Sequence, residues 1–156
     1  VLFRSGEEAG GGANTIWAHA SSINVFLDGK TISSYSCSAE LRGNSGSVIT
    51  GIGVICHEFG HTCGAPDFYD VDYGTGGEYD GTGEWDMMAG GSWNDDGDTP
   101  AHHNAYTKAK VYNWATATVI STISNNTLRD IKNFPDIFQI NTILIRIENS
   151  KHETNH

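Results

Sequence analysis

The stretch from His57 to Asp67 constrains this chain more than any other, because its spacing is that of a metal site built on a helix. It reads His-Glu-Phe-Gly-His-Thr-Cys-Gly-Ala-Pro-Asp. Residues four apart on an α-helix lie on one face, so His57 and His61 can bind one tetrahedral Zn²⁺ together. Glu58 follows the first histidine and reaches the open side of the metal as a base rather than as a ligand. The pattern therefore predicts a zinc site at which Glu58 is the general base.

The third ligand is predicted to come directly after this helix. Gly64 can adopt a positive φ and end the helix, and Pro66 prevents the helix from resuming. The chain then turns back and presents Asp67, which takes the place of the last histidine in the metzincin signature H-E-x-x-H-x-x-G-x-x-H. The alternative is a thermolysin-type site, with Glu78 or Glu84 supplied by a second helix. The glycines around both glutamates disfavour that helix, so Asp67 is the predicted ligand.

Two longer stretches, H-E-F-G-H-T-C-G-A-P-D-F-Y-D and G-E-W-D-M-M-A-G-G-S-W-N, resemble the immune inhibitor A-type metallopeptidases, which are secreted zinc endopeptidases. The resemblance implies that His57, His61 and Asp67 are the zinc ligands and that Glu58 is the catalytic residue. It also implies that Met88 is the methionine of the Met-turn, a tight turn beneath the zinc. Weaker similarity extends over residues 6–114.

Two positions depart from the pattern of that family. Ala89 stands where Ser is usual, and Asn113 stands before Trp114 where Gly is usual. Neither is a predicted ligand, and Asn is the non-glycine residue that best tolerates the left-handed conformation. The tyrosine that some metzincins carry two residues after the methionine is absent here.

Acidic residues outnumber basic ones, 19 to 9, and the formal net charge at pH 7 is −10. This balance argues against nucleic acid and anionic membranes as partners. No apolar run approaches the roughly 20 residues of a transmembrane helix. The chain opens on Val1 without an initiating methionine and is interpreted as an internal fragment of a longer precursor. We expect a secreted, extracellular monomer that acts on protein or peptide substrates.

The three cysteines, Cys37, Cys56 and Cys63, are too few for a disulfide scaffold. Cys56 and Cys63 lie seven residues apart on the predicted helix, about 10 Å along its axis, which exceeds the reach of a disulfide. Any bridge would therefore join Cys37 to one of them. At least one of the three is expected to be a small buried hydrophobic residue.

The segment before the active-site helix is predicted to be β-structure. Short strands are expected over 16–20 and 23–27, a hairpin turn at Asp28-Gly29 and a returning strand over 31–37. His19 in the first strand is interpreted as a structural residue, with a ligand role as the alternative.

The active-site helix has N-cap candidates in residues 44–47. Four apolar residues follow at spacings of four, three and four, which predicts a stripe that faces the core. They are Val48, Ile52, Ile55 and Phe59. Gly51, Gly53 and Gly60 lower the helix propensity, and close packing against a strand is the expected reason for them.

Residues 67–98 are rich in Gly, Asp, Tyr and Trp and are predicted to form a long functional loop. Asp95, Asp96 and Asp98 place oxygen ligands around a glycine, an arrangement that suits Ca²⁺, with a solvated acidic turn as the alternative. A second helix is predicted from Thr99-Pro100 to about Tyr112. The alternating pattern of 143–147 predicts a strand.

The predicted fold is α+β, a zincin or metzincin-like catalytic domain with a small twisted sheet, an active-site helix and an irregular second half. Residues 1–115 would form the zinc metallopeptidase core, and 116–156 the start of a β-rich segment. The predicted function is endopeptidase hydrolysis by a zinc-activated water, with Glu58 as base. Ca²⁺ is a candidate second cofactor. The alternative is a non-catalytic binding or adhesion module that Zn²⁺ or Ca²⁺ stabilises.

Overall fold

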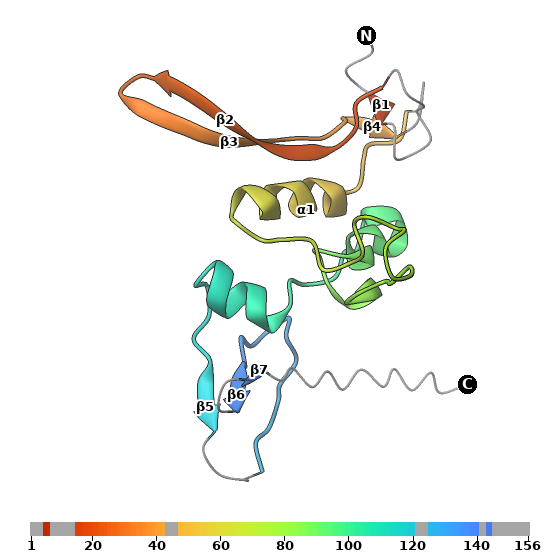
Figure 1. Ribbon diagram of the computed structural model, residues 1–156. Helices are drawn as coiled ribbons and strands as arrows, with labels where there is room; N and C mark the ends of the chain where they lie inside the picture. The colour runs from red at the N-terminus through yellow and green to blue at the C-terminus, as the bar shows by residue number, and fades with distance from the viewer. Residues whose placement is uncertain (1–4, 7–14, 43–46, 121–124, 141–142, 145–156) are drawn as a thin grey trace, which may run out of the picture. The chain divides into compact units, whose positions relative to one another are not determined.

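A computed structural model describes residues 5–6, 15–42, 47–120, 125–140 and 143–144 of the chain (Figure 1). The chain divides into two compact units, Val1–His103 and Asn104–His156. The first unit contains the predicted metal site. The domain boundary predicted between residues 115 and 116 remains a prediction.

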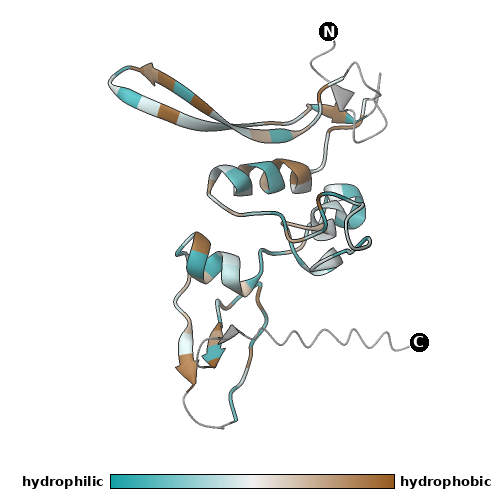
Figure 2. Ribbon diagram, in the orientation of Figure 1, coloured by the Kyte–Doolittle hydropathy of each residue, from teal (hydrophilic) through white to brown (hydrophobic). Residues whose placement is uncertain are grey.

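A long hairpin forms the first part of the described chain. Strand β2 (His19–Leu27) pairs antiparallel with β3 (Lys30–Cys37), with a β-bulge between Ser22 and Val25. Asp28 and Gly29 both have positive φ, 49° and 75°, as a two-residue hairpin turn requires. The predicted hairpin is therefore confirmed, although its first strand is continuous from His19 and does not begin at Ile16. Figure 2 shows apolar positions along both strands. Phe26 and Ile32 are among those that are exposed.

Helix α1 (Ile52–Thr62) lies between this hairpin and the irregular segment that follows it in the chain (Figure 1). It begins after Gly51, which has an extended backbone and makes no side-chain cap. Residues 44–46 of the predicted cap lie outside the described residues, and Ser47 is not at the helix start. At the other end, Gly64 has φ 98° and its N–H donates to the carbonyl of His61, so the predicted glycine stop is confirmed.

The prediction of a buried apolar stripe on this helix is wrong. Val48 precedes the helix, and Ile52, Ile55 and Phe59 are exposed. The buried face carries small residues together with the polar site residues: Gly53, Val54, His57, Glu58 and Gly60. Backbone proximity decides which face is buried, because small residues let the helix approach the irregular segment more closely than branched side chains would.

Helix α1 comes very close to this irregular segment at Gly53, where the sequence had predicted packing against a strand. A Cβ atom built on Gly53 would lie 1.8 Å from the carbonyl oxygen of Ser92, in the 3-10 helix η3 (Gly90–Gly97). No L side chain fits that space without a backbone shift. The backbones of helix α1 and η3 therefore pack directly against each other.

We expect Gly53→Ala to lower the free energy of unfolding by about 2–4 kcal/mol, because the methyl group forces α1 and η3 apart. Urea denaturation followed by tryptophan fluorescence measures this loss. Gly74→Ala is the matched control, since its Cβ would meet the nearest atom, the Asp72 carbonyl oxygen, at an ordinary 3.5 Å. Equal unfolding midpoints for the two variants would contradict the close approach.

The rest of the first unit is short and irregular, as predicted. Strand β1 (Ser5–Gly6) pairs in parallel with β4 (Leu41–Arg42). The segment after α1 contains only short 3-10 turns in its described residues, η2 (Gly83–Trp85) and η3, and η3 is interrupted by non-helical residues at Asn94–Asp96. All three cysteines are free and half-buried, so Cys37 forms no bridge with either of the others, and the expectation of a small buried cysteine is wrong.

The second unit begins with a helix shorter than the one predicted over 99–112. Its helical residues are Ala105, Tyr106 and the π-helical turn η4 (Thr107–Val111). The residues before it are engaged elsewhere: the Ala101 N–H donates to Gly91, and the His102 carbonyl accepts from Met87. Asn104 Oδ1 then accepts from the Thr107 N–H and caps the turn.

A three-stranded sheet completes the second unit. Strand β5 (Thr118–Ile120) is parallel to β6 (Phe138–Ile140), which is antiparallel to β7 (Ile143–Leu144). The predicted strand over 143–147 is thus seen at its first two residues, and the remainder lies outside the described residues. The architecture is mixed α/β with small sheets, which is compatible with a peptidase domain. In the described residues we find no helix of the length and apolarity needed to cross a membrane.

Candidate active site

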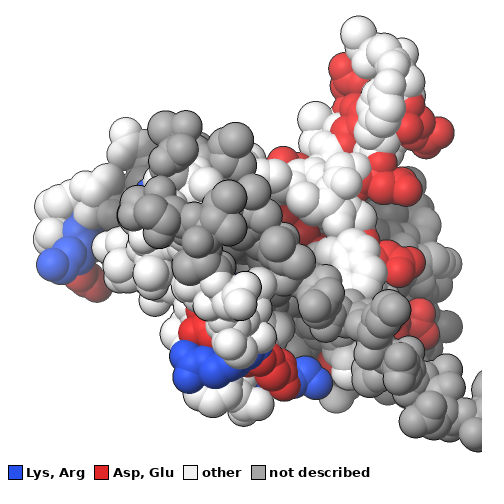
Figure 3. Space-filling view, turned by 90° about the horizontal axis from the view of Figure 1, so that it is seen from below, with Lys and Arg blue, Asp and Glu red and all other residues white. Residues whose placement is uncertain are grey.

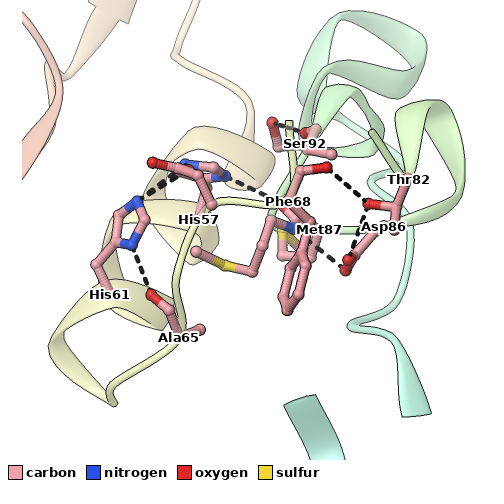
Figure 4. Close-up of polar contacts among 11 residues, drawn as sticks. His57, His61, Ala65, Phe68, Thr82, Asp86, Met87 and Ser92 are labelled. Atoms are coloured by element: carbon pink, nitrogen blue, oxygen red, sulfur yellow. Dashed lines mark hydrogen bonds and ion pairs between the residues drawn. The ribbon is translucent and has the colours of Figure 1, made fainter. Parts of the chain in front are cut away.

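The two histidines of α1 point to a common position (Figure 4). Their Nε2 atoms are 3.2 Å apart, and the rings meet edge to face with centroids 4.8 Å apart. This contact follows from their spacing of four residues on one helix.

Asp67 reaches the same position from the turn after α1. Its Oδ1 lies 3.1 Å from His57 Nε2 and 3.3 Å from His61 Nε2. Three ligands at zinc distances of about 2.0–2.1 Å in tetrahedral geometry would stand about 3.3 Å from one another. The three atoms are therefore spaced as the ligands of one zinc ion. Within the described part of the chain, these residues form the group of three whose ligand atoms converge.

The other nitrogen of each imidazole contacts a main-chain oxygen. His57 Nδ1 is 2.9 Å from the Met87 carbonyl, and His61 Nδ1 is 2.8 Å from the Ala65 carbonyl (Figure 4). A carbonyl only accepts, so both Nδ1 atoms are the donors, and the neutral rings present lone pairs at Nε2.

Two nitrogen lone pairs and a carboxylate oxygen thus converge with no proton between them when both rings are neutral. Asp67 Oδ1 is buried and accepts no well-formed hydrogen bond. Such a group of acceptors is repulsive by itself and is stabilised by a cation. The donor set, two imidazoles and one carboxylate, is one that Zn²⁺ prefers.

Charge within this group shifts the pKa values of its members. Burial alone would raise the pKa of Asp67, but the two imidazoles outweigh burial and hold the pKa well below its usual range. The Asp67 side chain in turn raises the pKa of His61. Asp67 therefore carries a negative charge, as a candidate metal ligand requires.

Glu58 is buried on the same helix and lines a cleft of about 840 Å³ together with His57. Burial is the main cause that raises the pKa of Glu58 above its ordinary value. The residue is not part of the converging group of three. A carboxylate with a raised pKa, next to a metal site and open to a cleft, suits proton transfer rather than metal binding.

Met88 is fully buried in the turn that supports the site. Its carbonyl accepts from the Phe68 N–H at 2.8 Å, directly after Asp67 in the chain. The turn closes by a hydrogen bond of 3.1 Å from the Ala89 N–H to the Asp86 carbonyl. The tight turn predicted at Met88 is thus connected to the chain directly after Asp67, while the role of Met88 remains a prediction.

Sequence reasoning did not single out Asp86 and Tyr69. The buried Asp86 carboxylate accepts from Thr82 Oγ1 at 3.1 Å and from the Met88 N–H at 3.3 Å, so it orders the turn (Figure 4). The ring of Tyr69 lies 6.4 Å from that of His57 and lines the cleft. Burial, with the charge of Asp67, raises the pKa of Tyr69 to about 12. The sequence feature that could have indicated Tyr69 is its position two residues after Asp67.

The residues considered as alternatives are not members of the converging group. His19 Nδ1 contacts the Trp17 carbonyl and Nε2 contacts the Tyr35 hydroxyl, which is the structural role predicted for it. Glu78 and Glu84 line the cleft but do not join the converging group.

The predicted calcium residues are also apart from the site. Asp96 and Asp98 form ion pairs with Arg42, and Asp95 Oδ2 accepts from Thr99 Oγ1. Calcium binding by these three residues remains a prediction.

An H-E-x-x-H helix whose two histidines converge with a carboxylate, close in the fold to a buried methionine turn, is the arrangement of a metallopeptidase domain. Comparison with known proteins gives the particular family. The model of the immune inhibitor A peptidase M6 family, catalytic domain, matches residues 2–116, so the chain belongs to this family.

Individual relatives agree with that assignment. The chain is 34% identical over 104 residues to the pre-pro-metalloprotease PrtV of Vibrio cholerae serotype O1, in both the M66-2 and the El Tor Inaba N16961 strains. It is 31% identical over 103 residues to immune inhibitor A of Bacillus thuringiensis subsp. alesti. Each match covers 56% of this chain but only 10% of PrtV and 14% of immune inhibitor A.

Proposed function

We propose that this chain is the zinc-binding part of an endopeptidase that hydrolyses peptide bonds in proteins. The observation that carries the proposal is the convergence of His57 Nε2, His61 Nε2 and Asp67 Oδ1 next to a cleft that Glu58 lines. The family and the names of the metalloprotease relatives support it.

In this proposal His57, His61 and Asp67 hold the zinc ion. When bound, zinc would supply a Lewis acid that polarises the scissile carbonyl and lowers the pKa of water toward about 7. Glu58 accepts the proton of the attacking water on its carboxylate and then donates it to the nitrogen of the leaving amine. The Met87 and Ala65 carbonyls keep the two imidazoles oriented throughout.

We further propose that the protein works outside the cell as a monomer. The acidic balance of the chain and the "pre-pro" form named for the relative PrtV support an exported protein. We also propose that Asp95, Asp96 and Asp98 bind Ca²⁺.

Removal and return of the metal test the proposed function. We expect the zinc-loaded chain to hydrolyse a fluorogenic peptide, to lose this activity on treatment with a chelator, and to regain it on addition of Zn²⁺ but not Ca²⁺. Measured zinc content should follow the activity. A chain that binds zinc stoichiometrically yet hydrolyses none of a broad peptide library would favour the non-catalytic metal-stabilised module instead.

A further inference from the structure

Aromatic and acidic residues line the cleft beside Glu58. Aromatic rings stand open to solvent along it, including Trp17, Tyr79 and Trp85, which are 64%, 65% and 61% exposed. Three acidic residues besides Glu58 also line it, Glu78, Asp80 and Glu84. No lysine or arginine is among the described residues of its lining.

The wider sequence reinforces this charge. Between Arg42 and Lys108 the chain contains no lysine or arginine, but it contains eleven aspartates and glutamates. Arg42 is itself engaged by Asp96 and Asp98. In Figure 3, acidic side chains follow one side of the view with no basic side chain among them. No positive side chain in this part of the sequence is available to neutralise the cleft.

The segment that carries the cleft carboxylates is anchored to the metal site. The Thr82 N–H donates to the Phe68 carbonyl at 2.9 Å, and the Asp70 N–H donates to the Tyr79 carbonyl at 3.1 Å. Gly81, at φ 60°, passes so close to Phe68 that a Cβ atom would lie 1.7 Å from its carbonyl oxygen. Residues 79–82 are therefore fixed against the chain that directly follows Asp67.

We propose that this cleft binds a lysine or arginine side chain of the substrate next to the scissile bond. This proposal rests on the proposed peptidase function and names the substrate class of the same site. Exposed aromatic faces attract a cation that approaches within about 6 Å of the ring, with a preference for guanidinium. Several carboxylates of one sign in a concave site add a field that concentrates positively charged substrates. A neutral side chain of the same shape gains neither the attraction to the aromatic faces nor the attraction to the carboxylates.

Matched peptides isolate the effect of the substrate's positive charge. They contain either arginine or its neutral isostere citrulline on one side of the scissile bond. We expect kcat/KM of the zinc-loaded chain to be about tenfold higher for the arginine peptide at low salt, and the ratio to fall as salt screens the carboxylates. The combined variant Glu78→Gln, Asp80→Asn, Glu84→Gln should reduce the preference to about twofold or less. Asp28→Asn, an equal change of residue type at the hairpin turn, should leave it unchanged.

Binding provides a readout that does not depend on turnover. The zinc-loaded Glu58→Gln variant should bind the arginine peptide more tightly than the citrulline peptide, by about the same tenfold ratio, as measured by tryptophan fluorescence. Equal binding of the two peptides, or a preference that survives the combined substitution, would overturn the proposal. Hydrolysis of both peptides at the same rate would overturn it and leave the peptidase function intact. Preferential binding by the zinc-loaded wild type without any hydrolysis would support the basic subsite and count against the peptidase function.

Discussion

Glu58→Gln is expected to lower kcat for peptide hydrolysis by about 10²–10⁴-fold, the contribution typical of a positioned general base. Glutamine keeps the size of the side chain but cannot take a proton from water at any relevant pH. Glu58 lies outside the converging group of ligands, so zinc content should stay unchanged. The variant therefore separates proton transfer from metal binding in a single substitution.

The measurement is a peptidase assay together with metal analysis of the same dialysed samples. Glu40→Gln is the matched control, since it makes the same chemical change at an exposed position away from the cleft. Wild-type turnover by Glu58→Gln would show that another group acts as the base. A parallel loss of zinc and activity would instead make Glu58 a ligand.

Asp67→Ala is expected to reduce zinc from about one ion per chain to a small fraction after dialysis, with at least about a 100-fold loss of affinity. The substitution removes the anionic member of the three-ligand group and leaves two imidazoles that cannot hold the ion tightly. Peptidase activity should fall with the zinc content. Excess zinc should restore little of it, because the coordination would remain incomplete.

Mass spectrometry of the metal content checks this result, with Asp28→Asn as the control for a lost acidic charge. If Asp67→Ala retained as much zinc as the wild type, the third ligand would be another residue, and the proposed peptidase function would still stand. A folded wild type without zinc affinity would overturn the proposed function.

The geometry of the site was largely predictable because the information that fixes it is local. Spacing of four residues on one helix brings His57 to His61, and a glycine stop with a following proline returns the chain to Asp67. These features depend on helix periodicity and on backbone preferences within eleven residues. The contact from the Met87 carbonyl was not predictable in detail, because it comes from thirty positions away and uses a main-chain atom.

The fold was less predictable where long-range backbone contacts compete with local patterns. The spacing of Ile52, Ile55 and Phe59 predicts a buried stripe, yet the small residues of the other face allow a closer approach to Ser92 and decide the orientation. The pattern of 99–112 predicts a full helix. Its first turn is lost because Ala101 and His102 pair with the segment of the methionine turn. The periodicity of apolar residues predicts which residues share a helix face, but it does not predict which face packs against another element.

The orientation of both imidazoles depends on carbonyl groups, and every residue type carries one. Side chains at positions 65 and 87 can therefore change during evolution without removing the two contacts that aim the ligands, provided that the chain keeps its path. Selection on ring orientation thus acts on the course of the polypeptide more than on residue identity at these two positions. Distant relatives can differ at both and still inherit the same alignment of the two rings.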